Sequence, residues 1–179
     1  MGDREIDLIN IALGRPVVYL ETQLVRNGKV LDQRYNFERY SVNAGLYPSR
    51  LTDGNESTKA YPASWFFDYI IDLGEVYKVR EIRLVWGMYG REPNYITEWR
   101  LYSQENFGQE ADPNIEKQWL LIESGGFPNA EVTVIRRDVF ARRFRIGAAS
   151  IDPQRGILVN WIGMTAFEAY IDRESPAPT

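Results

Sequence analysis

The chain has 179 residues, 44% hydrophobic residues and a formal net charge of −4, which suits one soluble domain with a substantial core. It contains no Cys and no His, so disulfide frameworks, thiol catalysis, His-dependent triads and ordinary zinc hydrolase sites are excluded. The acidic balance argues against a nucleic-acid partner, and no stretch approaches the roughly 20 apolar residues that a membrane span needs.

The two ends of the chain differ from its interior. The start, MGDREIDLIN, carries acidic residues where a signal peptide has a basic and then an apolar run. An exported parent protein would carry its signal outside this chain, and in that case we expect an extracellular or cell-surface location. The end, DRESPAPT at 172–179, is polar and proline-rich, which predicts a tail or linker after a single domain over residues 1–171.

The predicted elements are nearly all β-strands, because most periodic stretches alternate polar and apolar residues with period two. An extended segment at 10–21 comes first, and Asn27-Gly28 predicts a hairpin within 24–33. The polar, aromatic stretch at 34–48 is long for a simple connection and predicts a surface excursion or a functional loop.

Further strands are predicted along the rest of the chain, with the runs at 66–74 and 79–87 as adjacent core strands. The others are expected at 95–104, 117–124, 130–137, 142–150 and 157–171. About eight strands separated by turn clusters indicate an all-β sandwich or barrel.

The segment LTDGNEST at 51–58 allows three interpretations. Asp, Asn and Gly together suit a tight turn held by Asx hydrogen bonds, and Asn55-Glu56-Ser57 fits a glycan acceptor pattern. Asp53, Asn55 and Thr58 are also oxygen donors spaced closely enough to hold one hard cation. The segment alone does not decide among them.

Several stretches together resemble the discoidin, or coagulation-factor type C, domain family, which includes carbohydrate-binding modules of bacterial glycosidases. In chain order the similar stretches are NIALGRPV (10–17), LTDGNEST (51–58), YIIDLGEVYKVREIRLVW (69–86), ITEWRLYSQ (96–104), ARRFRI (141–146) and TAFEAY (165–170). The resemblance covers most of the chain. It implies an eight-stranded antiparallel jelly-roll β-sandwich of the galactose-binding-domain type and a binding role without catalysis.

The resemblance also implies a structural cation, usually Ca2+, in the loop at 51–58. Its ligands would be side chains matching Asp53 and Thr58 and backbone carbonyls matching Arg50 and Asn55. The family usually adds a Glu on the last strand, where this chain has Ala166. Glu168 lies two residues on, on the same face of a strand, and is the candidate replacement. The alternative is a turn held by its own hydrogen bonds.

Ligand binding in this family involves loops at one end of the sandwich, and WGMYGREPNY at 86–95 is the best local candidate. A pyranose needs an aromatic platform together with polar partners. Trp86, Tyr89 and Tyr95 are candidate platforms, and Arg91 and Asn94 are candidate partners. Trp86 also ends an alternating strand, which favours a core position for it.

Two other segments supply further candidates. The stretch 34–47 contributes Tyr40, and binding loop and packed excursion are equally compatible with it. IDPQRG at 151–156 contributes Arg155. The densest basic cluster is Arg136, Arg137, Arg142, Arg143 and Arg145. We interpret it as an exposed strand face beside acidic neighbours, with an anionic ligand as the alternative.

The predicted function is non-catalytic binding of a glycan or glycoprotein through loop aromatics, with a structural calcium ion. A protein-interaction or assembly domain on the same fold, contacting a protein partner or a neighbouring domain through 34–48, is the alternative. We expect no enzymatic activity, because no carboxylate pair has a spacing that fixes two carboxyl groups across a cleft.

Overall fold

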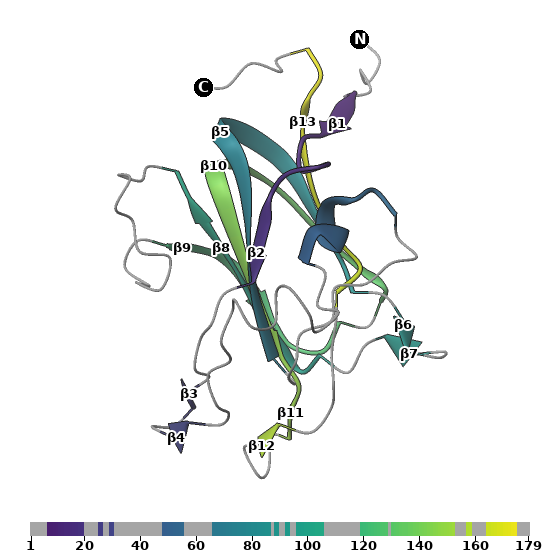
Figure 1. The fold of residues 1–179 in the computed structure, drawn as a ribbon, viewed down its shortest axis with the longest axis vertical. Helices are drawn as coiled ribbons and strands as arrows, with labels where there is room; N and C mark the ends of the chain where they lie inside the picture. The colour runs from purple at the N-terminus through teal and green to yellow at the C-terminus, as the bar shows by residue number, and fades with distance from the viewer. Residues whose placement is uncertain are drawn as a thin grey trace.

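A computed structural model of the chain describes residues 7–19, 25–26, 29–30, 48–55, 66–86, 88–89, 92–93, 96–105, 119–128, 130–152, 157–158 and 164–174. The described part is antiparallel β-structure with one short 3-10 helix, η1 (Pro48–Thr52), beside it (Figure 1). The strands are β1 (Leu8–Asn10), β2 (Val17–Tyr19), β3 (Val25–Arg26), β4 (Lys29–Val30), β5 (Phe66–Val85), β6 (Met88–Tyr89), β7 (Glu92–Pro93), β8 (Glu98–Gln104), β9 (Leu120–Gly125), β10 (Val132–Ala149), β11 (Ile151–Asp152), β12 (Ile157–Leu158) and β13 (Ala166–Asp172).

The main sheet has the strand order β1-β13-β5-β10-β8-β9, and β2 also pairs with β5. Three small hairpins, β3–β4, β6–β7 and β11–β12, are separate two-stranded ladders. The hairpin β3–β4 brackets Asn27-Gly28, which confirms the strongest turn signal of the sequence.

The two longest strands, β5 and β10, pair with each other along most of their length. The predicted strands 66–74 and 79–87 do not pair with each other, because they are the two halves of β5. The predicted strands 130–137 and 142–150 are likewise the two halves of β10. Gly74 does not reverse the chain: its φ of 86° and the bond from its amide to Asp72 (2.8 Å) bend β5 locally while the strand continues.

The pairing of these long strands divides the structure into two layers. The first layer joins the early half of β5 to β2 and to the late half of β10, which continues to β8 and β9. The second layer joins the late half of β5 to the early half of β10 and to β13 and β1. Register shifts in β10 between Arg136 and Val139, and between Ala141 and Arg143, lie where the layers meet.

Side chains from both layers form one core, which shows that the layers face each other. The rings of Phe144 in the first layer and Phe167 in the second lie 5.4 Å apart between centroids. Trp86, which follows the second-layer half of β5, lies 5.8 Å from Trp99 of β8 in the first layer. All four side chains are buried. The predicted all-β class is therefore confirmed as an antiparallel sandwich, while the strand number of an eight-stranded jelly roll stays a prediction.

The two ends of the sandwich carry different elements. Figure 1 shows β1 and the end of β13 at one end and the hairpins β3–β4, β6–β7 and β11–β12 toward the other. Near the termini, β13 includes Asp172, and the amide of Arg173 donates to the carbonyl of Asp7 (2.9 Å). The ordered strand thus continues past the predicted boundary at residue 171. In the described residues no helix has the length and apolar character to cross a bilayer.

Candidate functional site

The hairpin end of the sandwich is the candidate binding site, and the structure describes its base. Tyr89 lies in β6, at the predicted loop. The other predicted loop residues, Arg91, Asn94, Tyr95, Tyr40 and Arg155, lie outside the described residues. Figure 1 shows the hairpins β6–β7 and β11–β12 apart from each other, both in the half of the molecule away from β1 and the end of β13.

Trp86 is not a ligand platform, which corrects its place among the candidate binding residues. Its side chain is fully buried, and its indole Nε1 donates to the Thr133 hydroxyl (2.7 Å). Its ring faces Trp99 in the core. The sequence pattern favoured this core position. In the alternating strand before it, Ile82 and Leu84 lie on the buried face, and Trp86 comes next on that same face.

Backbone hydrogen bonds at the base of the hairpin end join four chain segments. The amide of Thr97 donates to the carbonyl of Ala149 (2.8 Å), and the amide of Thr165 donates to the carbonyl of Val85 (2.8 Å). The Thr97 hydroxyl adds a second bond to the Ala149 carbonyl (3.2 Å). Sequence reasoning missed Thr97, Thr133 and Thr165, because a threonine at a strand end carries no signal that distinguishes it from a surface residue.

The described part of the predicted metal loop, residues 51–55, begins in η1 and contains an Asx hydrogen bond. The Asp53 carboxylate accepts from the amide of Asn55 (2.8 Å), and Gly54 has a φ of 78°. The loop is tied to the chain before β2, because the amide of Gly14 donates to the Thr52 carbonyl (2.7 Å) and the Thr52 hydroxyl donates to the Arg15 carbonyl (2.8 Å). This is the Asx turn that the sequence offered as an alternative to a cation site.

Glu168, the candidate replacement ligand, makes its described contacts on the outer face of the second layer. It pairs in register with Arg83, and its carboxylate accepts from the Tyr170 hydroxyl (2.9 Å). Burial, together with the bond to Glu168 and its charge, raises the pKa of Tyr170 to about 12. Thr58 lies outside the described residues.

The donor set that the described residues offer a cation is therefore incomplete. Among them, no group of three or more carboxylate, His or Cys side chains lies together. Asp53 supplies one carboxylate, and the backbone carbonyls of Arg50 and Asn55 could add neutral oxygens. The fit to a hard cation is partial, and the calcium ion stays a prediction.

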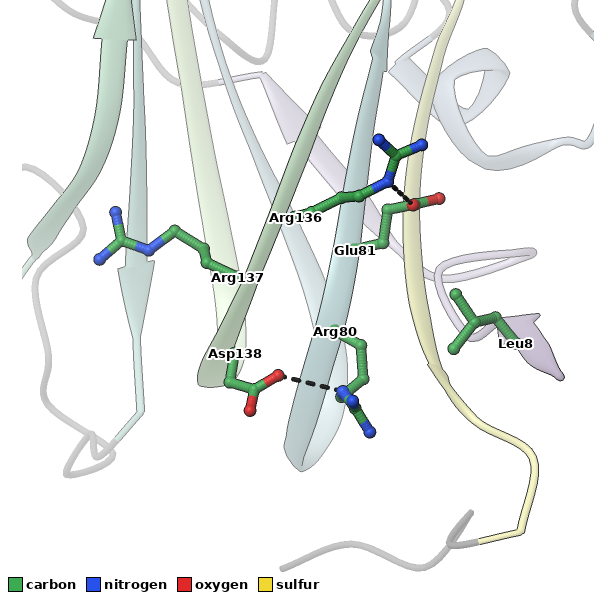
Figure 2. Close-up of a pocket in the computed structure, with 6 residues that line it drawn as sticks. All are labelled: Leu8, Arg80, Glu81, Arg136, Arg137 and Asp138. Atoms are coloured by element: carbon green, nitrogen blue, oxygen red, sulfur yellow. Dashed lines mark hydrogen bonds and ion pairs between the residues drawn. The ribbon is translucent and has the colours of Figure 1, made fainter. Parts of the chain in front are cut away.

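A charged cavity of about 380 Å³ lies on the outer face of the second layer (Figure 2). Its lining residues are Leu8, Arg80, Glu81, Arg136, Arg137 and Asp138. The Glu81 carboxylate is almost fully buried and bonds Arg83 and Arg136, each at 2.9 Å. Arg80 bonds Asp138 at 3.0 Å. In Figure 2 Arg137 points away from the side on which Arg136 meets Glu81, so the arginines do not converge on one ligand position.

The predicted basic cluster is balanced by the protein's own carboxylates. Arg136 pairs with Glu81, and Arg142 and Arg143 pair with Asp72. Arg145 pairs with Asp68 (3.0 Å) and lies over the Tyr102 ring, and its side chain is buried, which corrects its expected exposure. Arg137 donates to the Ile122 carbonyl (2.7 Å). The acidic neighbours expected from the sequence are present, and this pairing disfavours an anionic ligand.

Burial and arginine contacts act in opposite directions on two of these carboxylates. Burial alone would raise the pKa of Glu81, but hydrogen bonds from Arg136 and Arg83 and their charges outweigh it, so the pKa lies below its usual value. For Asp72, burial is likewise outweighed by the amide of Gly74 and by Arg143 and Arg142, and the pKa is lowered.

Comparison with solved structures finds carbohydrate-binding modules. Chitosan-binding module 1 of a chitosanase/glucanase from Paenibacillus sp. IK-5 has a TM-score of 0.61 and 15% identity, over 91% of this chain and 99% of that chain. The family 32 module of Clostridium perfringens NanJ, solved with galactose, has a TM-score of 0.51 and 18% identity, over 71% of this chain and 87% of that chain. This chain has the galactose-binding-like fold of these modules.

The fold also occurs inside larger enzymes. A GH29 fucosidase from Ruminococcus gnavus, solved with fucose, has a TM-score of 0.59 and 18% identity, over 93% of this chain but only 27% of that chain. No protein-family model and no curated protein sequence matches this chain. At these identities the likeness establishes the fold, and binding properties must be argued from the residues.

Proposed function

We propose that this chain is a non-catalytic carbohydrate-binding module that binds glycans at its hairpin end, on a galactose-binding-like jelly roll. The observation that carries the proposal is the match over nearly the full length of an isolated chitosan-binding module. The position of Tyr89 in β6, within a short hairpin after the long strand β5, supports the choice of this connection as the proposed site.

Two features deepen this proposal. Tyr89 and Tyr95 are the proposed stacking platforms, and Arg91, Asn94, Tyr40 and Arg155 are the proposed polar and aromatic partners. A calcium ion bound near Asp53, with Glu168 or another oxygen completing its shell, is proposed as structural support. We place the module in a larger exported protein, where it would meet glycans outside the cell.

A glycan array followed by titration of the best ligand tests the proposal. The variant Tyr89→Ala should raise Kd about tenfold or more with little change in Tm, because a stacking aromatic at a binding surface contributes on this scale. Tyr77→Ala is the matched control, because Tyr77 lies in β5 near its bend and packs against the core. It should lower Tm without changing Kd. Silence of the wild-type protein across the array would refute the proposal.

The calcium part has its own test. A thermal unfolding scan with calcium and then with a chelator should show a higher Tm with calcium, since a ligand that binds only the folded state stabilises it. Asp53→Ala should abolish the difference. An unchanged Tm in wild type would leave the Asx turn as the sole function of the loop.

The described structure also gives one reason to keep a protein partner as a second candidate. Among the described strands β9 lies at the edge of the main sheet, and it exposes Leu120 (67%) and Leu121 (51%), while Phe127 beyond it is 48% exposed. Adjacent exposed apolar residues on an edge strand favour contact with another surface. The predicted contact segment 34–48 is described only at Pro48. Light scattering of the purified chain distinguishes self-association from a monomer, and Leu121→Lys should abolish any dimer.

A further inference from the structure

The connection between β9 and β10 carries an exposed aromatic ring. It runs from Gly125 of β9, in the first layer, to Val132 of β10, in the second, and the structure describes it except at residue 129. The side chain of Phe127 in this connection is 48% exposed. None of the binding segments predicted from the sequence includes this position, so Phe127 is an aromatic candidate that only the structure brings forward.

Contacts on both sides of Phe127 fix the backbone of the connection. Before it, Gly125 lies so close to Trp99 that an added Cβ would be 2.7 Å from Trp99 Nε1. Directly after it, Pro128 is buried. Further on, the carbonyl of Glu131 accepts from the amide of the residue that follows β5 (2.8 Å). An aromatic ring on a fixed backbone gives up little conformational freedom when a ligand stacks on it.

These contacts also locate the connection at one end of the sandwich. A Cβ added at Gly126 would lie 3.7 Å from the Thr97 carbonyl, so the chain before Phe127 passes the start of β8. At its other end, β10 begins opposite Val85, the last residue of β5. The connection that contains Tyr89 leaves the sheet after this same residue. Phe127 therefore lies at the end of the sandwich from which the proposed binding connection departs.

The charges of this part of the chain are acidic. Residues 119–131 include two carboxylates, Glu123 and Glu131, and no Lys or Arg. Both carboxylate side chains are exposed. Arg100 pairs in register with Ser124 and so lies further along β8 than the residue opposite Gly125. Carboxylates beside a binding surface repel an anionic ligand and admit a neutral or cationic one.

We propose that Phe127 is an aromatic platform for the apolar face of a pyranose that carries no negative charge. This inference rests on the proposed function and extends it, because it adds a binding residue from the β9–β10 connection and excludes acidic sugars as ligands. A phenylalanine ring has no polar group, so it contributes stacking and the burial of sugar C–H groups. Hydrogen bonds to the sugar hydroxyls must come from other side chains.

Titration of the glycan that wild type binds most tightly on an array tests the platform. Phe127→Ala should raise Kd about tenfold or more with little change in Tm, because a stacking aromatic contributes on this scale. Phe127→Tyr keeps the ring and should keep Kd near the wild-type value. Phe140→Ala is the matched control: Phe140 is 44% exposed, but it lies opposite Lys78, at the far end of the second-layer half of β10. It should leave Kd unchanged.

A second readout needs no variant. With 13C-labelled phenylalanine rings, addition of the same glycan should shift the ring resonances of Phe127 and leave those of Phe140 in place. The array itself tests the charge: wild type should bind neutral or amino-bearing glycans, and not glycans that end in a uronic or sialic acid. A preference for the acidic glycans would overturn the inference.

The outcomes separate this inference from the proposed function. If wild type binds glycans and Phe127→Ala leaves Kd unchanged, the inference is wrong and the proposed function stands. If Phe127→Ala instead dissociates a dimer without changing Kd, Phe127 belongs to a protein contact and the inference is again wrong. Silence of wild type across the array refutes the proposed function, and this inference with it.

Discussion

The interior and the outer faces of this sandwich are held by different forces. Inside, aromatic rings from the two layers contact each other, as Phe144 and Phe167 do. Outside, Glu81 of β5 pairs with Arg83 on the same strand and with Arg136 on β10. Asp72 of β5 pairs with Arg142 and Arg143 on β10. The interior contacts hold the layers together, whereas the outer ion pairs align strands within a layer. Removing an interior ring should therefore cost far more stability than removing an outer charge.

The largest expected effect is at the ring contact between the layers. Phe144→Ala should lower the free energy of unfolding by about 3–5 kcal/mol, because it removes a fully buried ring and leaves a cavity. Phe140→Ala is the matched control on the same strand, because Phe140 is 44% exposed. Urea unfolding of both variants checks the difference. Equal losses would mean that the rings between the layers are not what holds them together.

A smaller effect is expected where a glycine makes room for a tryptophan. Gly125 pairs with Trp99, and a Cβ at Gly125 would lie 2.7 Å from Trp99 Nε1. Gly125→Ala should cost about 1–3 kcal/mol, because Trp99 must move within a packed core. The adjacent Gly126 has only the Thr97 carbonyl near that position, at 3.7 Å, so Gly126→Ala should be tolerated. Thermal unfolding and the near-ultraviolet circular dichroism of the tryptophans measure both.

The outer ion pairs should appear as a pH dependence. Because the folded pKa of Glu81 is lowered from 4.5, its stabilisation is present above that value and is lost as pH falls through the lower folded pKa. Glu81→Gln should cost about 1 kcal/mol at neutral pH and flatten the decline of Tm with acid. Glu123→Gln, at an exposed position of β9, should change neither. If the Tm of Glu81→Gln falls with acid as steeply as the Tm of the wild type, other carboxylates cause the decline.

The smallest effect compares two threonines at the hairpin end. The Thr165 hydroxyl is buried and has no hydrogen-bond partner among the described residues, whereas the Thr133 hydroxyl bonds Trp86. Thr165→Val should therefore be neutral or slightly stabilising, within about 0.5 kcal/mol, because a buried hydroxyl without a partner is unfavourable. Thr133→Val should cost about 1 kcal/mol. Denaturant unfolding separates the two, and a clear loss in Thr165→Val would indicate a bridging water.

The sequence by itself determined the all-β class, the hairpin at Asn27-Gly28 and the core position of Trp86. These depend on local patterns, because alternation sets which side chains share a face and Asn-Gly suits a tight turn. It also placed Tyr89 in the connection after the predicted strand 79–87, where the structure has the short strand β6.

Only the tertiary structure decided how these elements combine. The period-two pattern does not reveal whether two runs are neighbours or halves of one bent strand, so β5 and β10 were each expected as two strands. The burial of Arg145 and the bonds of Thr97 and Thr165 depend on segments distant in sequence. Long-range pairing is set by the whole core, and no local stretch of the chain encodes it.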